Sequence, residues 1–337
     1  MLETTWFLLW GLLWGIFFVL DGFDFGIGTL MPFMAKNELD KRAFYSASGP
    51  FWDGNEVWLI TAGGVTFAAF PGTYAVLFSS LYTALMLLLF AIILRGVSYE
   101  FRLHSESDGA KRLWDAVHVI GSFLPALLLG VAFANIFKGV PINEEGIFQG
   151  GLLTLLNPYG LAGGVLFVLM FLVHGALWLA IKTVDDLEDR ARAMAARLWP
   201  VLTVWVVIFL VYTATATRLL GNYMKNPLLF LILLAAVLGL VMMRVYLGAG
   251  RLWFAWASSA IFILSTTLFG VVGMYPALLP SSLNPAWSMT IYNSSSSPLT
   301  LKIMLTVTLI FVPIVLIYQG WVYKKFSFKL TEEELHY

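Results

Sequence analysis

Cysteine is absent from the 337 residues, histidine occurs four times, and charged residues make up only 12% of the chain. The absence of cysteine excludes disulfide frameworks, thiolate metal sites and cysteine nucleophiles. A soluble domain carries about 25% charged residues, so this chain lacks the charge needed to cover a surface that faces water. The twenty Lys and Arg residues balance the twenty Asp and Glu residues, so no net charge favours a nucleic acid as partner.

Hydrophobic residues, by contrast, make up 60% of the chain, and the mean hydropathy is +0.84. A transmembrane helix needs about 20 mostly apolar residues. The sequence contains nine such runs, which predicts an all-α, polytopic membrane protein whose residues 1–337 form a single integral membrane domain. The predicted spans are 5–34, 52–70, 73–94, 113–137, 159–181, 198–217, 227–243, 252–276 and 300–323.

The second run is the least apolar, and its strictly apolar part, Val57–Phe70, is short enough to be re-entrant. Lys and Arg residues concentrate in the cytoplasmic loops of membrane proteins. Nine spans with the N-terminus outside place sixteen Lys and Arg residues on the cytoplasmic side and four outside, whereas a re-entrant second run gives thirteen and seven. We therefore predict nine spans, an outside N-terminus and a cytoplasmic C-terminus.

Two acidic residues, Asp21 and Asp24, lie in the inner half of the first span. An acidic side chain inside the bilayer costs at least about 2.5–3.5 kcal/mol, so it marks a functional site by default. Three residues apart, these acids share one helical face. They repel each other when both are ionised, so we expect at least one to hold a proton. The alternative is that both serve only as hydrogen-bonded contacts between helices.

Four glycines of the same span, Gly11, Gly15, Gly22 and Gly26, fall on a different stripe of the helix. Small residues in a stripe let two membrane helices approach closely. The stripe predicts such packing, and the acids would then face another neighbour, a cavity or a partner chain.

A second polar cluster lies within residues 49–58, at the cytoplasmic start of the second span. Asp53 is a candidate helix N-cap, and Glu56, three residues later, completes a pattern like a capping box. Capping alone would explain these two acids. It does not explain the residues crowded around them, which are Trp52, Asn55 and Trp58.

The histidines show no pattern typical of a cofactor-binding site. His118 and His174 lie in different predicted spans with no visible pairing, whereas a haem takes axial ligands such as His or Met from its surroundings. We expect no haem, no metal and no catalytic residue in this chain. P-loop and dinucleotide fingerprints are also absent, because the glycines lie inside apolar spans.

Seven strings together resemble subunit II of the cytochrome bd family of quinol oxidases. They follow the family order over essentially the whole chain, and Trp-Asp-Gly-Asn within the second string is the most specific. Phe51 and Glu56 stand where some relatives carry His and Gln, so no protonatable role is carried over to position 51. The strings are residues 20–28, 49–64, 67–71, 130–135, 139–141, 155–160 and 275–282.

The resemblance implies a haem-free companion subunit with two four-helix bundles and one peripheral helix, in a bacterial or archaeal cell membrane. The partner, subunit I, would carry haems b and d, oxidise quinol and reduce dioxygen to water. A small single-span subunit and membrane lipids are further expected partners.

In this family, protons reach the oxygen-reducing site from the cytoplasm through polar residues near the subunit interface. The resemblance makes Asp53, Asp21 and Asp24 candidates for that path, with Glu56 and Asn55 carrying it onward. Trp52, Gly54 and Trp58 would support the motif.

Two other functions remain open at this point. Intramembrane carboxylates also serve proton-coupled secondary transporters, although the inverted repeats and paired broken helices of transporters are not visible here. A purely structural assembly subunit is the third possibility. A coloured, haem-rich partner that co-purifies would argue against a stand-alone transporter.

Overall fold

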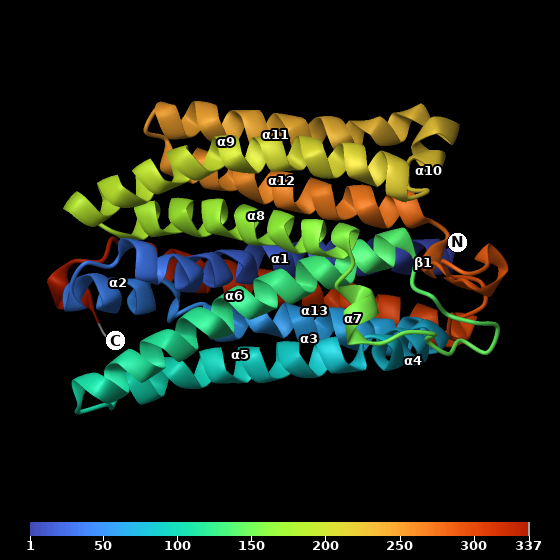
Figure 1. Cartoon of the computed structure of the whole chain (residues 1–337), viewed down its shortest axis with the longest axis horizontal. Helices are drawn as coiled ribbons and strands as arrows, with labels where there is room; N and C mark the ends of the chain where they lie inside the picture. The colour runs from blue at the N-terminus through green and yellow to red at the C-terminus, as the bar shows by residue number, and fades with distance from the viewer. Residues whose placement is uncertain (336–337) are drawn as a thin grey trace.

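The computed structural model describes residues 1–335, which fold into long helices lying along one axis, with short elements at the two ends (Figure 1). The all-α fold class is confirmed. The long helices are α1 (Leu2–Met34), α3 (Trp52–Ala69), α5 (Tyr82–Leu103), α6 (Asp108–Lys138), α8 (Pro158–Lys182), α9 (Asp185–Ala216), α11 (Phe230–Gly248), α12 (Leu252–Met274) and α13 (Pro298–Lys325).

The short elements connect these helices. They are α2 (Glu38–Ser48), α4 (Pro71–Ser80), α7 (Leu152–Leu155), α10 (Leu220–Lys225), the 3-10 turns Pro227–Leu229, Pro285–Trp287 and Glu332–Glu334, and an antiparallel pair of strands, β1 (Ala277–Leu279) and β2 (Met289–Thr290).

Eight helices within residues 1–335 are long and apolar enough to cross a membrane. The eighteen-residue α3 is not among them, yet it runs beside α1 along the long axis (Figure 1). The N-terminus and the described C-terminal end lie at opposite ends of the molecule, as an odd number of crossings requires. Nine spans with the N-terminus outside stay a prediction.

Two predicted spans differ from the helices observed. The run 73–94 is divided at Leu81, where α4 ends and α5 begins. Helix α5 then continues past residue 94 to Leu103, because the polar residues beyond the apolar run form a buried helical face instead of a loop. Helix α9 begins at Asp185, ahead of the predicted start at 198, with three acids in its first turn that suit the positive end of a helix dipole.

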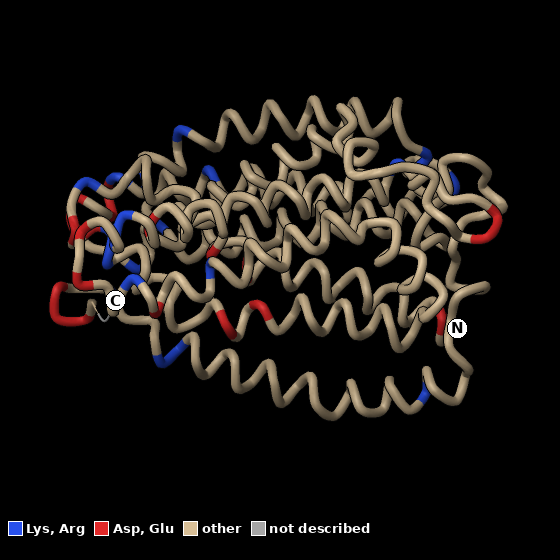
Figure 2. The backbone as a smooth tube through the Cα atoms, turned by 60° about the horizontal axis from the view of Figure 1, so that its bottom comes forward, with Lys and Arg blue, Asp and Glu red and all other residues tan. Residues whose placement is uncertain are grey.

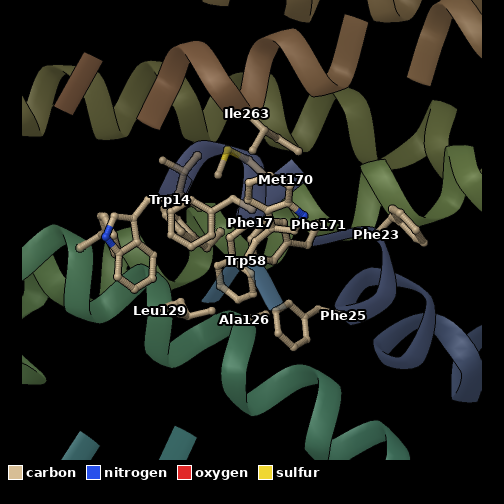
Figure 3. Packing of buried hydrophobic residues seen from close by; sticks show 14 of the residues in the cluster. Trp14, Phe17, Phe23, Phe25, Trp58, Ala126, Leu129, Met170, Phe171 and Ile263 are labelled. Carbon is tan, nitrogen blue, oxygen red and sulfur yellow. The ribbon is translucent and has the colours of Figure 1, made fainter. Parts of the chain in front are cut away.

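Helix α1 occupies the centre and packs against α3, α6, α8 and α12. Its aromatic side chains interlock with those of α6 and α8: the Phe18 ring lies 5.0 Å from that of Phe133 and 4.9 Å from that of Phe167, both edge-on. Figure 3 shows the same packing around Phe17, Phe25 and Phe171, among others. Edge-to-face aromatic pairs add about 0.5–1.5 kcal/mol each beyond their buried area.

The glycine stripe of α1 packs as predicted. Gly11 and Gly15 meet α12, and Gly22 and Gly26 meet α8. The approach is tightest at Gly26, where an added Cβ would lie 1.9 Å from the backbone oxygen of Phe171.

Helix α13 touches its own chain sparsely, and only 6% of its most apolar stretch is buried. The segment that follows α13 is hydrogen-bonded to the end of α8. Lys182, at the end of α8, donates hydrogen bonds to the carbonyl oxygens of Phe326 and Phe328, and the Leu330 amide donates back to the Lys182 carbonyl. We call residues 326–335 the C-terminal strap. Charged residues in general gather at the two ends of the molecule, with few between (Figure 2).

Gly26→Ala is expected to lower the free energy of unfolding by about 1–3 kcal/mol, because the methyl group forces α1 away from α8. Unfolding of the purified protein by titration with a denaturing detergent would measure this. Gly109→Ala in the first turn of α6, where an added Cβ meets nothing within 4 Å, is the control and should change stability by less than about 1 kcal/mol. Equal effects at both positions would contradict the packing argument.

Candidate functional site

Asp21 and Asp24 of α1 are fully buried inside this chain. Asp21 Oδ1 accepts a hydrogen bond from Arg95 Nη2 at 2.7 Å, and the Arg95 side chain is itself fully buried on α5. The neighbours that shelter the acids are therefore α3 and α5 of the same chain, so a partner chain is not needed to keep them from lipid.

Arg95 holds a second carboxylate. Its Nη2 atom also lies 2.5 Å from Oε1 of Glu56, on α3. The guanidinium carbon stands 4.3 Å from the centre of the Phe25 ring, a cation–π arrangement that helps to shelter the charge. One arginine thus joins α1, α3 and α5 in a region from which water is largely excluded.

Asp24 accepts a hydrogen bond from the side-chain amide of Asn55. Asn55 Nδ2 donates to Asp24 Oδ2 at 2.7 Å and to the carbonyl oxygen of Leu20 at 3.1 Å. Asn55 Oδ1 in turn accepts a hydrogen bond of 2.8 Å from the Tyr323 hydroxyl, which α13 supplies. We call Asp21, Asp24, Glu56 and Arg95 the acidic cluster.

The acidic cluster contains three carboxyl groups and one guanidinium. If all three carboxyls were ionised, the buried group would carry two uncompensated negative charges, which a low-dielectric interior strongly disfavours. Asp21 Oδ2 and Asp24 Oδ1 are buried and have no hydrogen-bond donor among residues 1–335. A proton on either carboxyl would reduce the charge and supply the missing donor.

The prediction that Asp53 caps α3 is wrong. The helix begins at Trp52 with Phe51 in the N-cap position, and no side chain of the described residues caps it. Asp53 instead lies in the first turn with an exposed side chain. Glu56 pairs with Arg95, so the capping-box pattern does not form and helix capping explains neither acid.

The supporting residues of the motif have separate roles. Trp52 stacks on Tyr99 of α5 with ring centres 5.3 Å apart, and Trp58 Nε1 donates to Gln319 Oε1 of α13 at 3.0 Å. Gly54 faces open space, since an added Cβ would meet nothing within 4 Å. The two Trp residues thus hold α3 between α5 and α13. Gly54 adds no side chain to the surface of α3 that faces away from the rest of the chain.

Sequence reasoning missed Arg95, Gln319 and Tyr323. Arg95 follows the apolar run directly, so it reads as a residue of a cytoplasmic loop. One signal could have found it: Ser98, Tyr99 and Arg102 follow Arg95 at helical spacing, and all four are buried. Such a polar stripe indicates a helix that continues with a buried face.

The two intramembrane histidines each form a hydrogen bond with a serine hydroxyl. His174 uses both ring nitrogens, one with the Ser259 hydroxyl at 2.5 Å and one with the Val19 carbonyl at 2.9 Å. His118 Nδ1 pairs with the Ser98 hydroxyl at 2.9 Å, whereas its Nε2 is buried beside Gly28 and has no hydrogen-bond partner among residues 1–335. No three His, Cys, Asp or Glu side chains of residues 1–335 come together in a way that could hold a metal ion.

Comparison with known proteins gives consistent matches over the whole chain. The family model described as cytochrome bd terminal oxidase subunit II matches residues 2–326. A probable cytochrome oxidase subunit 2 of Haemophilus influenzae is 36% identical, over 96% of this chain and 94% of that protein.

Two further relatives are subunits 2 of named oxidases. The cytochrome bd-I ubiquinol oxidase subunit 2 of Escherichia coli K12 is 36% identical, over 99% of this chain and 97% of its own. The cytochrome bd ubiquinol oxidase subunit 2 of Bacillus subtilis is 34% identical, over 99% of this chain and 98% of its own. The fold also matches a chain in the structure of bd oxidase from Geobacillus thermodenitrificans, with a TM-score of 0.76, 19% identity, and coverage of 96% and 98%.

Arg95→Gln is expected to lower the free energy of unfolding by about 3–5 kcal/mol, because it leaves buried carboxylates without their cation. Asp21→Asn should cost less, since Arg95 keeps Glu56. Detergent-induced unfolding of the purified protein would rank the two.

The control for this ranking is Arg192→Gln on α9. The Arg192 side chain is 38% exposed and pairs at 3.9 Å with Glu188, four residues earlier on the same helix, so its loss should cost about 0.3–0.5 kcal/mol. A cost for Arg95→Gln no larger than that of the control would show that the Arg95 pairs contribute little.

Proposed function

The chain belongs to the cytochrome bd terminal oxidase subunit II family, and we propose that it is a haem-free companion that conducts protons toward a haem-bearing partner. The membership confirms the resemblance carried by strings such as residues 49–64, and it makes the chain a subunit of a membrane-bound quinol oxidase. A match that covers residues 2–326 favours this over a stand-alone transporter.

The partner in this proposal is subunit I, which carries haems b and d, oxidises quinol and reduces dioxygen. The relatives from Escherichia coli and Bacillus subtilis are named as ubiquinol oxidase subunits, and we extend a quinol substrate to the present complex. A small single-span subunit and lipids complete the assembly, in the cytoplasmic membrane of a bacterium or archaeon. The engaged ring nitrogens of His174 support a haem-free role for this chain.

The observation that carries the proton path is the graded burial of acids along α3 and α1. The Asp53 side chain is exposed at the start of α3. Glu56, one turn further, is 17% exposed, and Asp21, which shares Arg95 with Glu56, is fully buried. Oxygen reduction consumes protons, and a series of carboxyls leading from water into the bilayer suits their uptake.

The inner end of the path lies beside α13. Asp24 connects through Asn55 to Tyr323 by hydrogen bonds of 2.7 and 2.8 Å. The outer side of α3 next to Glu56 exposes Val57 and Ile60. We place the partner against α3 and α13, so that protons held by the acidic cluster cross the interface there.

Asp53→Asn tests the entry of this path. It keeps the size of the side chain but cannot take up a proton, so quinol oxidase turnover and charge uptake should fall about tenfold, equivalent to about 1.4 kcal/mol in the barrier. Turnover, haem content and subunit ratio would be measured on the purified complex.

The matched control is Asp108→Asn, because Asp108 is likewise an exposed acid in the first turn of a helix. It should leave turnover unchanged. If Asp53→Asn complexes assemble fully and turn over at the parent rate, Asp53 has no part in proton uptake and the purely structural alternative stands.

A further inference from the structure

A cavity of about 260 Å³ lies away from the acidic cluster, between α6, α8, α9, α11 and α12. Phe133 of α6, Phe167 of α8 and Phe269 of α12 line its inner wall. Val207 of α9 and Val237 of α11 also line it and are about half exposed. The cavity therefore opens sideways, between α9 and α11, toward the hydrocarbon layer.

The opening between α9 and α11 is bounded along its length. At one end, Trp199 Nε1 of α9 donates to the Leu240 carbonyl of α11 at 2.8 Å. At the other end, Leu219 lines the cavity just before α10. On α9 the lining runs from Thr203 to Thr213, about 15 Å at 1.5 Å per residue. That length is about half of a hydrocarbon core of about 30 Å, so the cavity spans one leaflet.

Of the hydroxyl groups that line the cavity, those of three threonines and of Tyr159 are hydrogen-bonded within residues 1–335, and Thr266 adds one further hydroxyl. The hydroxyl groups of Thr203, Thr213 and Thr267 each donate to a carbonyl of their own helix. The Tyr159 hydroxyl pairs with that of Thr213 at 2.9 Å. A water molecule in a cavity needs about two to four polar partners, and apolar cavities of this kind stay dry and take apolar guests.

We propose that this cavity binds one acyl chain of an anionic phospholipid from the bilayer. The charges at the Leu219 end support the choice of headgroup. Arg218 precedes Leu219 directly and Lys225 ends α10; both are exposed. Neither forms an ion pair with an acid among residues 1–335. A phosphate at the headgroup level would meet these cations while the chain lies between α9 and α11.

This proposal does not depend on proton conduction and is tested with a different readout. The purified complex is placed in phosphatidylcholine bilayers with a trace of phosphatidylglycerol that carries a photoactivatable group near the end of one acyl chain. After irradiation, mass spectrometry locates the labelled residues. Phe133 and Phe167 are buried, so a lipid chain reaches them only by entering the cavity, and we expect both to be labelled.

Val207→Phe, at the mouth, should lower the labelling of Phe133 and Phe167 at least tenfold. The matched control is Val211→Phe, one turn further on α9, where the residue is equally exposed but does not line the cavity; it should leave the labelling unchanged. Val237→Phe closes the mouth from α11 and replaces Val207→Phe if that variant assembles poorly. Labelling confined to exposed residues, or unaffected by either mouth variant, overturns the proposal.

The headgroup is tested by moving the photoactivatable chain from phosphatidylglycerol to phosphatidylcholine. Labelling of Phe167 should fall at least threefold in the parent complex, and the double variant Arg218→Gln/Lys225→Gln should erase that difference. Equal labelling by both lipids in the parent overturns the anionic assignment. Mass analysis of the extracted complex must find a phospholipid that Val207→Phe removes. A quinone in its place, or an adventitious detergent only, overturns the proposal.

Discussion

The structure depends on how the charge of one buried guanidinium is balanced. Arg95 pairs with acids from two other helices, Asp21 of α1 and Glu56 of α3, with side-chain contacts of 2.7 and 2.5 Å. Breaking such a pair inside a membrane protein leaves a charge that neither lipid nor packing can compensate. The relative positions of α1, α3 and α5 follow from this requirement. The same three helices then bring Asn55 to Asp24 and Trp52 to Tyr99.

Helix α1 packs against a neighbouring helix with one face and carries its buried acids on another. Gly22 and Gly26 let α8 approach to backbone contact, while Asp21 and Asp24 turn toward α3 and α5. Close packing on the glycine face excludes lipid and water from one side of the acids. Because α8 packs against that face at backbone contact, the carboxyls are held at a fixed depth, which suits the proton path that we propose.

The sequence predicted the features that depend on one helix at a time. The apolar runs located the long helices, and the spacing of Asp21, Asp24 and the four glycines assigned the two faces of α1. Features that depend on contacts between helices were not accessible. Arg95 lies just beyond an apolar run, and its burial depends on carboxylates that two other helices supply. Asp53 has the type and spacing of a cap, but the N-cap position is at Phe51, two residues earlier, and Asp53 is left exposed.

The hydrogen bonds that α13 makes with α3 have a consequence for how the protein is made. Helix α13 follows the other long helices of residues 1–335, so it is synthesised after them, and it contributes Tyr323 and Gln319 to the hydrogen bonds around Asn55 and Trp58. The surroundings of Asp24 are thus incomplete until the final helix enters the membrane. The C-terminal strap then fastens that helix through the Lys182 ammonium group. In a chain cut short before α13, the side of Asn55 that faces α13 would stay uncovered. That uncovered amide is a local feature by which membrane quality control could distinguish a truncated chain from one that contains α13.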